Sequence, residues 1–320
     1  MKKHTLTLLL LSNCRYLLFI LVVLLVGCSI DDNRDECPDD IWVTFKYKYA
    51  SQQKKDLIDQ LDLFAFDEKG VLCLHETGYV LALDGNFRKR ITLPSGKYTF
   101  IAWAGLSDES TYLTSDMVIG KTRMDEVQVQ LLGVNNSRVD FKPGILLFGK
   151  VPDYTAQLKK NPEVVIPMIT DNNQINVKVR HKGVKAERRE NLASIRLEIT
   201  DNNSVYTFDN QINRGTEEFV YTPFLNKETL NSIDCSFYVL KLQDDGYKPM
   251  LKLKNVTSDE IIIEEDLVAL IRKVNEIYGE KIDLERDTVF NIELELDSNN
   301  VIITLVINGW VLIQQGAVVG

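Results

Sequence analysis

Histidine and cysteine are scarce in this chain, whose 320 residues include only three of the former and five of the latter. His4 lies in the N-terminal segment, and His75 and His181 are far apart in the sequence. Nothing therefore favours a histidine-based zinc site or a Ser-His-Asp triad. The chain also lacks a C-x-x-C pair, a P-loop and a G-x-G-x-x-G motif. We expect a protein that is not an enzyme and has no cofactor and no metal site.

The N-terminal segment has no apolar run long enough to cross a membrane. Lys2 and Lys3 precede an uninterrupted apolar run from Leu17 to Val26, which is ten residues long, whereas a membrane-spanning helix needs roughly 20. The run ends in Leu25-Val26-Gly27-Cys28, which has the form of a bacterial lipobox. We therefore expect residues 1–27 to be a lipoprotein signal peptide. The Cys28 thiol would carry the lipid that attaches the mature chain to a membrane.

Positive charge is in short supply after the signal peptide. Three basic residues and no acids fall within residues 1–27, so the mature chain has 37 − 3 = 34 basic and 46 acidic residues, a net charge of −12. This balance argues against nucleic acid as a partner. Residues 28–37 are polar, mostly acidic and without periodicity, which predicts a flexible lipidated tether. The acidic stretch resembles the signal that exports lipoproteins to the cell surface in Bacteroidia-type bacteria.

Three cysteines remain in the mature chain besides Cys28, an odd number for an oxidising compartment. Cys37 and Cys73 could pair if the strands that carry them lie side by side. The other interpretation, which we favour, is that Cys37, Cys73 and Cys235 are free buried thiols.

Short stretches rich in Val, Ile, Phe and Tyr alternate with Gly, Asn and Asp turns, which predicts an all-β protein. Ile41 to Tyr49 alternates between apolar and polar residues, as in a half-buried strand. Tyr98 to Ala104 is largely apolar on both faces, which predicts a central strand. We expect a turn at Asp171-Asn172-Asn173 and place the domain boundary there, with an N-terminal domain at 38–171 and a C-terminal domain at 172–320.

Two hairpins and one helix are predicted in the second half. The first hairpin pairs Leu192–Thr200 with Val205–Phe208, and the second pairs Cys235–Leu242 with Tyr247–Leu253. Glu264 to Gly279 carries apolar residues at helical spacing, with acids at its start and glycine at its end. The chain then finishes on a long apolar stretch, Val301 to Ile313.

Several sequence segments form a recognisable pattern when they are taken in order. They are Cys28, Cys37-Pro38-Asp39-Asp40, Leu63-Phe64-Ala65-Phe66-Asp67 with Gly70, Leu93 to Trp103, Leu147-Phe148-Gly149 and Ile307-Asn308-Gly309-Trp310. Together they resemble one known family, the fimbrial anchor lipoproteins of Bacteroidia-type bacteria, which are the anchoring subunits of the major and minor fimbria. The resemblance spans nearly the whole mature chain, and Leu93 to Trp103 is its most specific part.

The resemblance implies two tandem transthyretin-like β-sandwich domains, with the amphipathic helix in the second. It also implies a surface-exposed lipoprotein of the outer membrane, held there by the lipid on Cys28, that anchors a fimbrium at its base and limits its length. The partners would be fimbrial shaft subunits, joined by β-strand contact. The strand-exchange candidates lie in the C-terminal apolar stretch and are Val301, Ile303, Leu305 and Ile307.

Other functions remain open at this point. The chain could be a fimbrial tip or accessory subunit, since a lipobox suits either role. It could be a surface glycan-binding lipoprotein, which would need exposed aromatic rings. Trp42, Trp103 and Trp310 all lie in predicted strands, so core packing is favoured for them. A lipid-anchored hydrolase would need converging titratable groups, for which the sequence offers nothing.

Overall fold

The computed structural model describes most of the chain after the predicted tether. Cys28 and Cys37 lie outside the described residues. These are 39–52, 60–79, 83–106, 112–132, 137–157, 163–182, 195–215, 217–228, 232–297 and 299–314.

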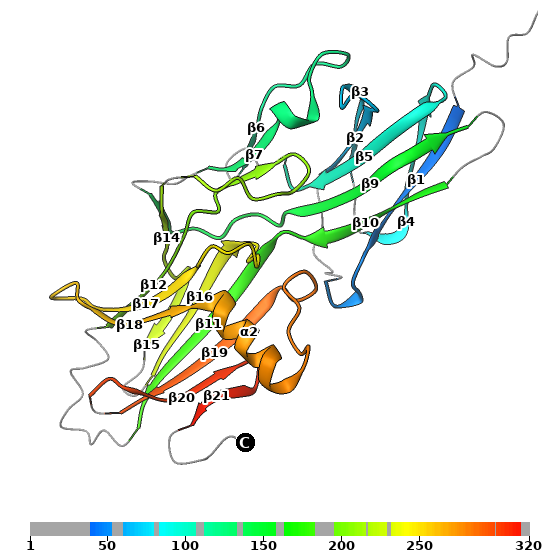
Figure 1. Ribbon diagram of the computed structural model, residues 1–320. Helices are drawn as coiled ribbons and strands as arrows, with labels where there is room; N and C mark the ends of the chain where they lie inside the picture. The colour runs from blue at the N-terminus through cyan, green and yellow to red at the C-terminus, as the bar shows by residue number, and fades with distance from the viewer. Residues whose placement is uncertain are drawn as a thin grey trace, which may run out of the picture.

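The first half of the chain forms one seven-stranded sheet, seen in blue to green in Figure 1. Its strands are hydrogen-bonded in the order β3 (Leu72–Tyr79), β2 (Gln60–Asp67), β5 (Gly96–Ala104), β9 (Leu147–Ala156), β10 (Glu163–Thr170), β1 (Asp39–Tyr47) and β4 (Asp84–Leu93).

Strand β5 lies in the interior of this sheet and is apolar on both faces, as its sequence predicts. Phe100 and Ala102 join an inner cluster that also contains Ile41 and Phe45 of β1. Trp103, on the opposite face, is fully buried in a second cluster. A strand covered on both faces needs apolar residues at every position, which explains the continuous pattern.

The two outermost strands of this sheet approach each other, so the sheet curls around its inner cluster. Lys89 of β4 donates a hydrogen bond to the carbonyl oxygen of Thr77 on β3 at 2.6 Å and pairs with Glu76 at 2.8 Å. Nearby, the Phe87 ring packs directly on Gly78, where a Cβ would lie 2.8 Å from the ring. Among the described residues, side-chain contacts therefore close this seam, and no hydrogen-bonded ladder joins β3 to β4.

The second half forms a sandwich of two larger sheets and contributes to a small third one. The six-stranded sheet has the order β15 (Leu225–Glu228), β16 (Ser232–Leu240), β11 (Asn172–His181), β19 (Val289–Leu296), β20 (Ile302–Ile307) and β21 (Trp310–Gln314). The five-stranded sheet has the order β18 (Ile261–Asp266), β17 (Met250–Asn255), β12 (Ile195–Asp201), β14 (Phe219–Tyr221) and β8 (Arg138–Val139). The small sheet contains β13 (Val205–Thr207), β7 (Gln128–Leu131) and β6 (Tyr112–Thr114).

The turn predicted at Asp171-Asn172-Asn173 is wrong. Asp171 is a single link between β10 of the first sheet and β11 of the six-stranded sheet, and it has no exposed surface. Figure 1 shows the two green strands following each other through the length of the molecule. In addition, β7 pairs with β13, and β8 pairs with β14, so strands from the first half enter sheets of the second. The division at 171/172 stays a prediction.

Both predicted hairpins of the second half are wrong as well. After β12, the chain continues into β13, which pairs with β7 in the small sheet instead of returning along β12. Likewise β16 and β17 belong to different sheets. A turn of this kind can return the chain along the same sheet, but it can also pass the chain from one layer of a sandwich to the other.

The predicted helix is confirmed with a shorter range, as α2 (Leu267–Tyr278). Asp266 caps it by accepting hydrogen bonds from the backbone N–H groups of Val268 and Ala269, both at 3.0 Å. The expected all-β fold with β-sandwich domains and one amphipathic helix is thereby confirmed. Within the described residues, no helix has the length and apolar character needed to cross a membrane.

Gly149 of β9 provides a test of the packing between β9 and β10. A Cβ there would lie 2.5 Å from Met168 Sδ and 2.8 Å from the Pro167 carbonyl oxygen. Gly149→Ala should therefore overpack the core and lower the free energy of unfolding by about 1–3 kcal/mol, measured by urea denaturation.

The matched control is Gly215→Ala, because Gly215 is exposed and its nearest atom would be 3.9 Å from the added Cβ. Equal stability of the two variants would contradict the close β9–β10 approach.

Candidate functional site: the junction and the sheet edges

Gln52 at the end of η2 (Ala50–Gln52) joins three segments of the chain. Its Nε2 group donates hydrogen bonds to the carbonyl oxygens of Glu285 at 2.7 Å and Arg286 at 2.9 Å. Its Oε1 atom accepts the Thr170 N–H at 3.0 Å. Gln52 is only 1% exposed, so these backbone groups are satisfied away from water. One buried amide thus fastens the first half to the loop that follows α2.

Glu285 adds a second set of contacts across the junction. Its carboxylate accepts hydrogen bonds from Lys48 Nζ at 2.6 Å and from the Tyr49 hydroxyl at 2.9 Å. Partial burial would raise the pKa of the Glu285 carboxyl, but the hydrogen bonds from Lys48 and Tyr49 outweigh it and hold that pKa below its usual value. The orange segment after α2 therefore lies against blue η2 in Figure 1.

Behind this contact, Lys241 and Asp171 bury opposite charges. Lys241 Nζ donates to the carbonyl oxygens of Thr170 at 3.0 Å and Glu285 at 3.1 Å. Burial lowers the pKa of Lys241, opposed by the charges of Asp171 and Glu285. Burial raises the pKa of Asp171 to about 6, although Lys241 and a hydrogen bond from Asn210 act in the opposite direction. Burial of the ionised Asp171 carboxyl is thus unfavourable for the free energy of folding.

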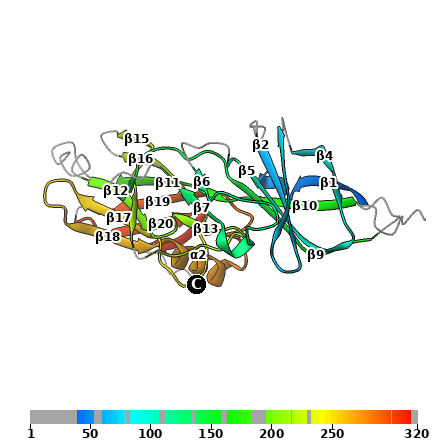
Figure 2. The same ribbon diagram turned by 90° about the horizontal axis from the view of Figure 1, so that it is seen from above.

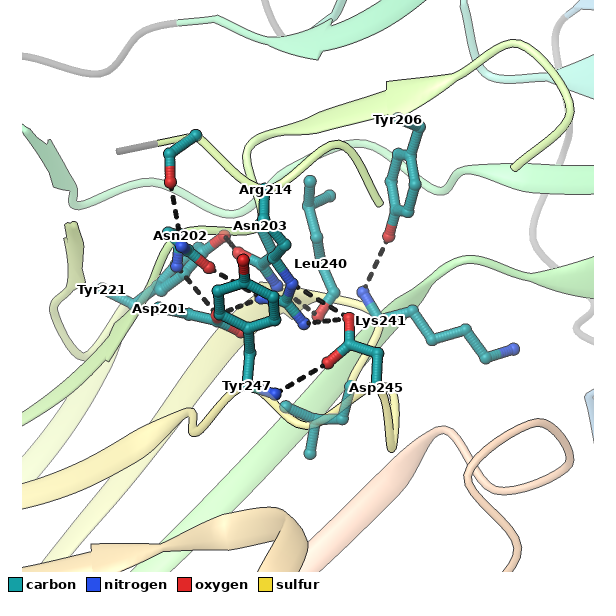
Figure 3. Close-up of polar contacts among 12 residues, drawn as sticks. Asp201, Asn202, Asn203, Tyr206, Arg214, Tyr221, Leu240, Lys241, Asp245 and Tyr247 are labelled. Carbon is teal, nitrogen blue, oxygen red and sulfur yellow. Dashed lines mark hydrogen bonds and ion pairs between the residues drawn. The ribbon is translucent and has the colours of Figure 1, made fainter. Parts of the chain in front are cut away.

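Tyr206 ties the strand crossing to the second sandwich. Its hydroxyl donates to the Asp171 carbonyl oxygen at 3.1 Å and accepts the Lys241 N–H at 3.0 Å. Figure 3 shows this ring next to a larger polar cluster. There, Arg214 pairs with Asp201, donates to Asp245 at 2.8 Å and stacks on the Tyr247 ring at 4.8 Å. These contacts order the loops at the same end of the sandwich.

A cavity of about 580 Å³ lies beside the junction, between α2 and the loop after it. Its apolar floor includes Leu242 and Ile282, and its polar wall includes Asp244, which is paired with Arg272 at 2.6 Å. Among the described residues, no three His, Cys, Asp or Glu side chains gather in a metal-binding arrangement. The contacts at the junction hold the first half of the chain against the second half.

The structure places the sequence-predicted strand-exchange residues at the C-terminal side of the six-stranded sheet. Ile303, Leu305 and Ile307 lie on β20, and Val301 precedes it and is 48% exposed. Strand β20 is hydrogen-bonded to β19 on one side and β21 on the other. A foreign strand could therefore pair with β20 only after β21 has left. Cys28, the predicted lipid attachment site, lies outside the described residues.

The two edges of the six-stranded sheet differ in how they are covered. At one edge, the Tyr278 hydroxyl of α2 donates to the Val311 carbonyl oxygen of β21 at 2.7 Å. At the other edge, all four residues of β15 are exposed, and the preceding Phe224 is 47% exposed. Figure 2 shows α2 and β15 on opposite sides of the second sandwich. The β15 edge is thus the more accessible of the two to another chain.

The tryptophans are not gathered in one place. Trp103 is fully buried, as expected, but Trp42 on β1 and Trp310 on β21 are only partly buried and belong to different sheets. Both cysteines that the structure describes are free, with Cys235 buried and Cys73 partly buried.

Sequence reasoning missed the junction residues. Gln52 and Glu285 are 233 positions apart, and neither belongs to a periodic segment or a motif. The one available signal was the polar Asp171-Asn172-Asn173 run between two apolar strand patterns, which we interpreted as a turn. A buried acid at a strand crossing gives the same pattern.

The fold and the junction define a class of elongated all-β proteins with two β-sandwich domains in tandem. The model of the fimbrillin-A associated anchor proteins Mfa1 and Mfa2 matches residues 34–316. The chain belongs to this family. No curated protein matches it in sequence.

Solved structures share the fold. The fimbrial anchor protein Mfa2 from Porphyromonas gingivalis is 19% identical, with a TM-score of 0.71, and the match covers 87% of this chain and 100% of that one. A candidate adhesin from Bacteroides thetaiotaomicron is 21% identical, with a TM-score of 0.72 and coverage of 86% and 98%. A candidate polysaccharide-binding protein from the same species is 18% identical, with a TM-score of 0.74 and coverage of 88% and 99%. The expected β-sandwich fold is thereby confirmed.

Asp171 predicts a pH dependence of stability. Its folded pKa of about 6 lies above the value of 3.8 for an exposed Asp, so the folded state binds more protons than the unfolded state between these values. Stability from this group is therefore lost as pH rises from about 4 to 6, by up to about 3 kcal/mol. Asp171→Asn should gain urea stability relative to wild type over this range.

The control for this measurement is Asp116→Asn, which removes an exposed carboxylate from an irregular segment. A difference between wild type and Asp171→Asn that stays constant from pH 4 to 7 would show that burial does not perturb Asp171.

Proposed function

We propose that this protein anchors a fimbrium to the outer membrane through the lipid on Cys28 and limits the length of the fimbrium. The observation that carries the proposal is family membership over residues 34–316, together with the lipobox at Leu25 to Cys28. Acyl chains contribute about 0.8 kcal/mol per buried methylene, so two or more chains hold a protein stably in a membrane.

The anchoring role fits the physical arrangement of the chain. A subunit that has its own N-terminus tied to lipid cannot donate that terminus to the next subunit, so it is suited to end a polymer. The junction at Gln52 and Glu285 fastens the two halves to each other. A pull on the far half would then be transmitted to residues 28–37, the proposed tether.

Contact with fimbrial shaft subunits is proposed to occur by β-strand pairing, in which backbone hydrogen bonds supply affinity and alternate side chains supply specificity. Val301, Ile303, Leu305 and Ile307 remain the strand-exchange candidates, with β21 displaced from β20. The exposed β15 edge is the alternative place for such pairing, since no displacement is needed there.

The anchoring role predicts a specific defect in the native host. Deletion of the gene and Cys28→Ala should both release fimbriae into the medium, because the shaft loses its link to the membrane. Fimbrial protein on cells and in medium is measured by immunoblotting, and fimbria length by electron microscopy. In addition, the deletion should lengthen the fimbriae.

Cys235→Ala is the matched control, because Cys235 is a buried free thiol and no lipid is expected on it. Unchanged attachment and length in the deletion strain would exclude the anchoring role. Unchanged attachment with reduced adhesion of the cells would instead favour a tip or accessory subunit.

The proposed replacement of β21 by a strand of a shaft subunit can be tested with a disulfide that joins β20 to β21. Thr304 and Gln314 lie opposite each other on β20 and β21, so Thr304→Cys with Gln314→Cys should form a disulfide that keeps β21 in place. The oxidised variant should lose binding to shaft subunits in a pull-down assay, and reduction should restore it. Undiminished binding by the oxidised variant would rule out β20 and direct attention to β15.

A further inference from the structure

A second cavity, of about 350 Å³, opens at the junction on the far side of the loop that follows α2. Ser51 of η2 contributes to its wall, as do Lys281, Arg286 and Thr288 of the loop, Asn308 of the β20–β21 turn, and Trp310. This volume lies within the range of roughly 300–1,000 Å³ that is typical of small-ligand sites. Gln52, next to Ser51, holds η2 against the backbone of the loop.

The ring of Trp310 is held rigidly beside this cavity. It packs on the Tyr278 ring at a centroid distance of 5.0 Å, and the Tyr278 hydroxyl is bonded to the backbone of β21. Trp310 is only partly buried, so it is not a core residue like Trp103. The Lys281 ammonium group lies over this ring, so a ligand reaches its flat apolar surface by drawing the exposed Lys281 side chain aside.

The charges around this cavity favour an anion. Lys281 places its ammonium group 5.3 Å from the centre of the Trp310 ring, and no carboxylate of a described residue is within ion-pair distance of it. Arg286 is paired with Asp287 through two hydrogen bonds, at 2.9 and 2.8 Å. The lining therefore carries two cations and one carboxylate, in a mature chain whose net charge is −12 (34 basic and 46 acidic residues).

The remaining groups suit a ligand with several hydroxyl groups. Asn308 accepts the Asn291 N–H on its Oδ1 atom at 2.7 Å, which leaves its amide nitrogen as a donor. Ser51 and Thr288 add hydroxyl groups that both donate and accept. A carboxylate by itself would leave the aromatic surface of Trp310 unused, whereas a sugar ring that carries a carboxylate would use this surface, the polar groups and the cation together.

We propose that this cavity binds an acidic saccharide, with the sugar ring against Trp310 and its carboxylate paired with Lys281. The proposal does not depend on the anchoring role, because it concerns the isolated protein. The same chemistry occurs in sialylated glycans of a host and in uronic-acid polysaccharides, so the test includes both sources.

The test is isothermal titration calorimetry on the full mature chain in detergent. The probes are sialyllactose and a galacturonic acid trisaccharide, with lactose as the neutral sugar and a short glutamate peptide as the acidic non-sugar. We expect one of the acidic sugars to bind and lactose to bind at least about tenfold more weakly, since it lacks the carboxylate. Which acidic sugar binds identifies the source.

Two variants locate the binding. Lys281→Gln should weaken the acidic sugar about tenfold and leave lactose unchanged, and Trp310→Ala should abolish binding of both. The matched control is Lys142→Gln, because Lys142 lies over the Tyr238 ring at 4.9 Å in a similar pair elsewhere. Since Lys281 is exposed, its replacement should leave the fold intact. Circular dichroism checks the fold of each variant.

Three results would overturn the proposal. These are failure of both acidic sugars to bind at millimolar concentration, equal binding by wild type and Lys281→Gln, and binding of the glutamate peptide in place of the sugars. None of these results bears on the anchoring role, which is tested by release of fimbriae from cells.

Discussion

The structure depends on one crossing, at which the chain passes from the first sheet into the second sandwich through the single residue Asp171. The direct continuation of β10 into β11 fixes the distance between the first sheet and the second sandwich, but it does not fix how one is rotated relative to the other. The rotation is fixed by buried polar groups around the crossing, above all by Gln52, which satisfies backbone groups from two segments. The unfavourable burial of Asp171 and Lys241 is tolerated because it comes with this order.

Much of the local structure could be predicted from the sequence, because it depends on neighbouring residues. The alternation from Ile41 and the two apolar faces of Tyr98 to Ala104 both matched strands, and the helical spacing after Asp266 matched α2. The connections between strands could not be predicted, because a turn such as Asp201-Asn202-Asn203 does not specify the sheet that the next strand joins. The junction was missed for the same reason, since Gln52 and Glu285 meet only in the folded chain.

The strand edges on the two sides of the second sandwich are covered to different extents. The helix α2 follows β18 directly and its Tyr278 contacts β21, so one helix covers edges of both sheets. On the opposite side, no helix among the described residues covers β15, whose four residues are exposed. In the first sheet, by contrast, the two edge strands face each other and Lys89 bridges them. Exposed strand edges can pair with strands of other chains. Because the β15 edge is exposed, the second sandwich is the half of the molecule that is better suited to such association.

The placement of β1 has a mechanical consequence. The described chain begins at Asp39 on this strand, which is hydrogen-bonded to β10 on one side, from Trp42 to Tyr47, and to β4 on the other. A force applied along β1 at Asp39 loads these hydrogen bonds in shear, so they share the load and must yield together. Peeling would break them one at a time at a much lower force. The parallel neighbour β10 then carries the same load through Asp171 directly into β11 of the six-stranded sheet.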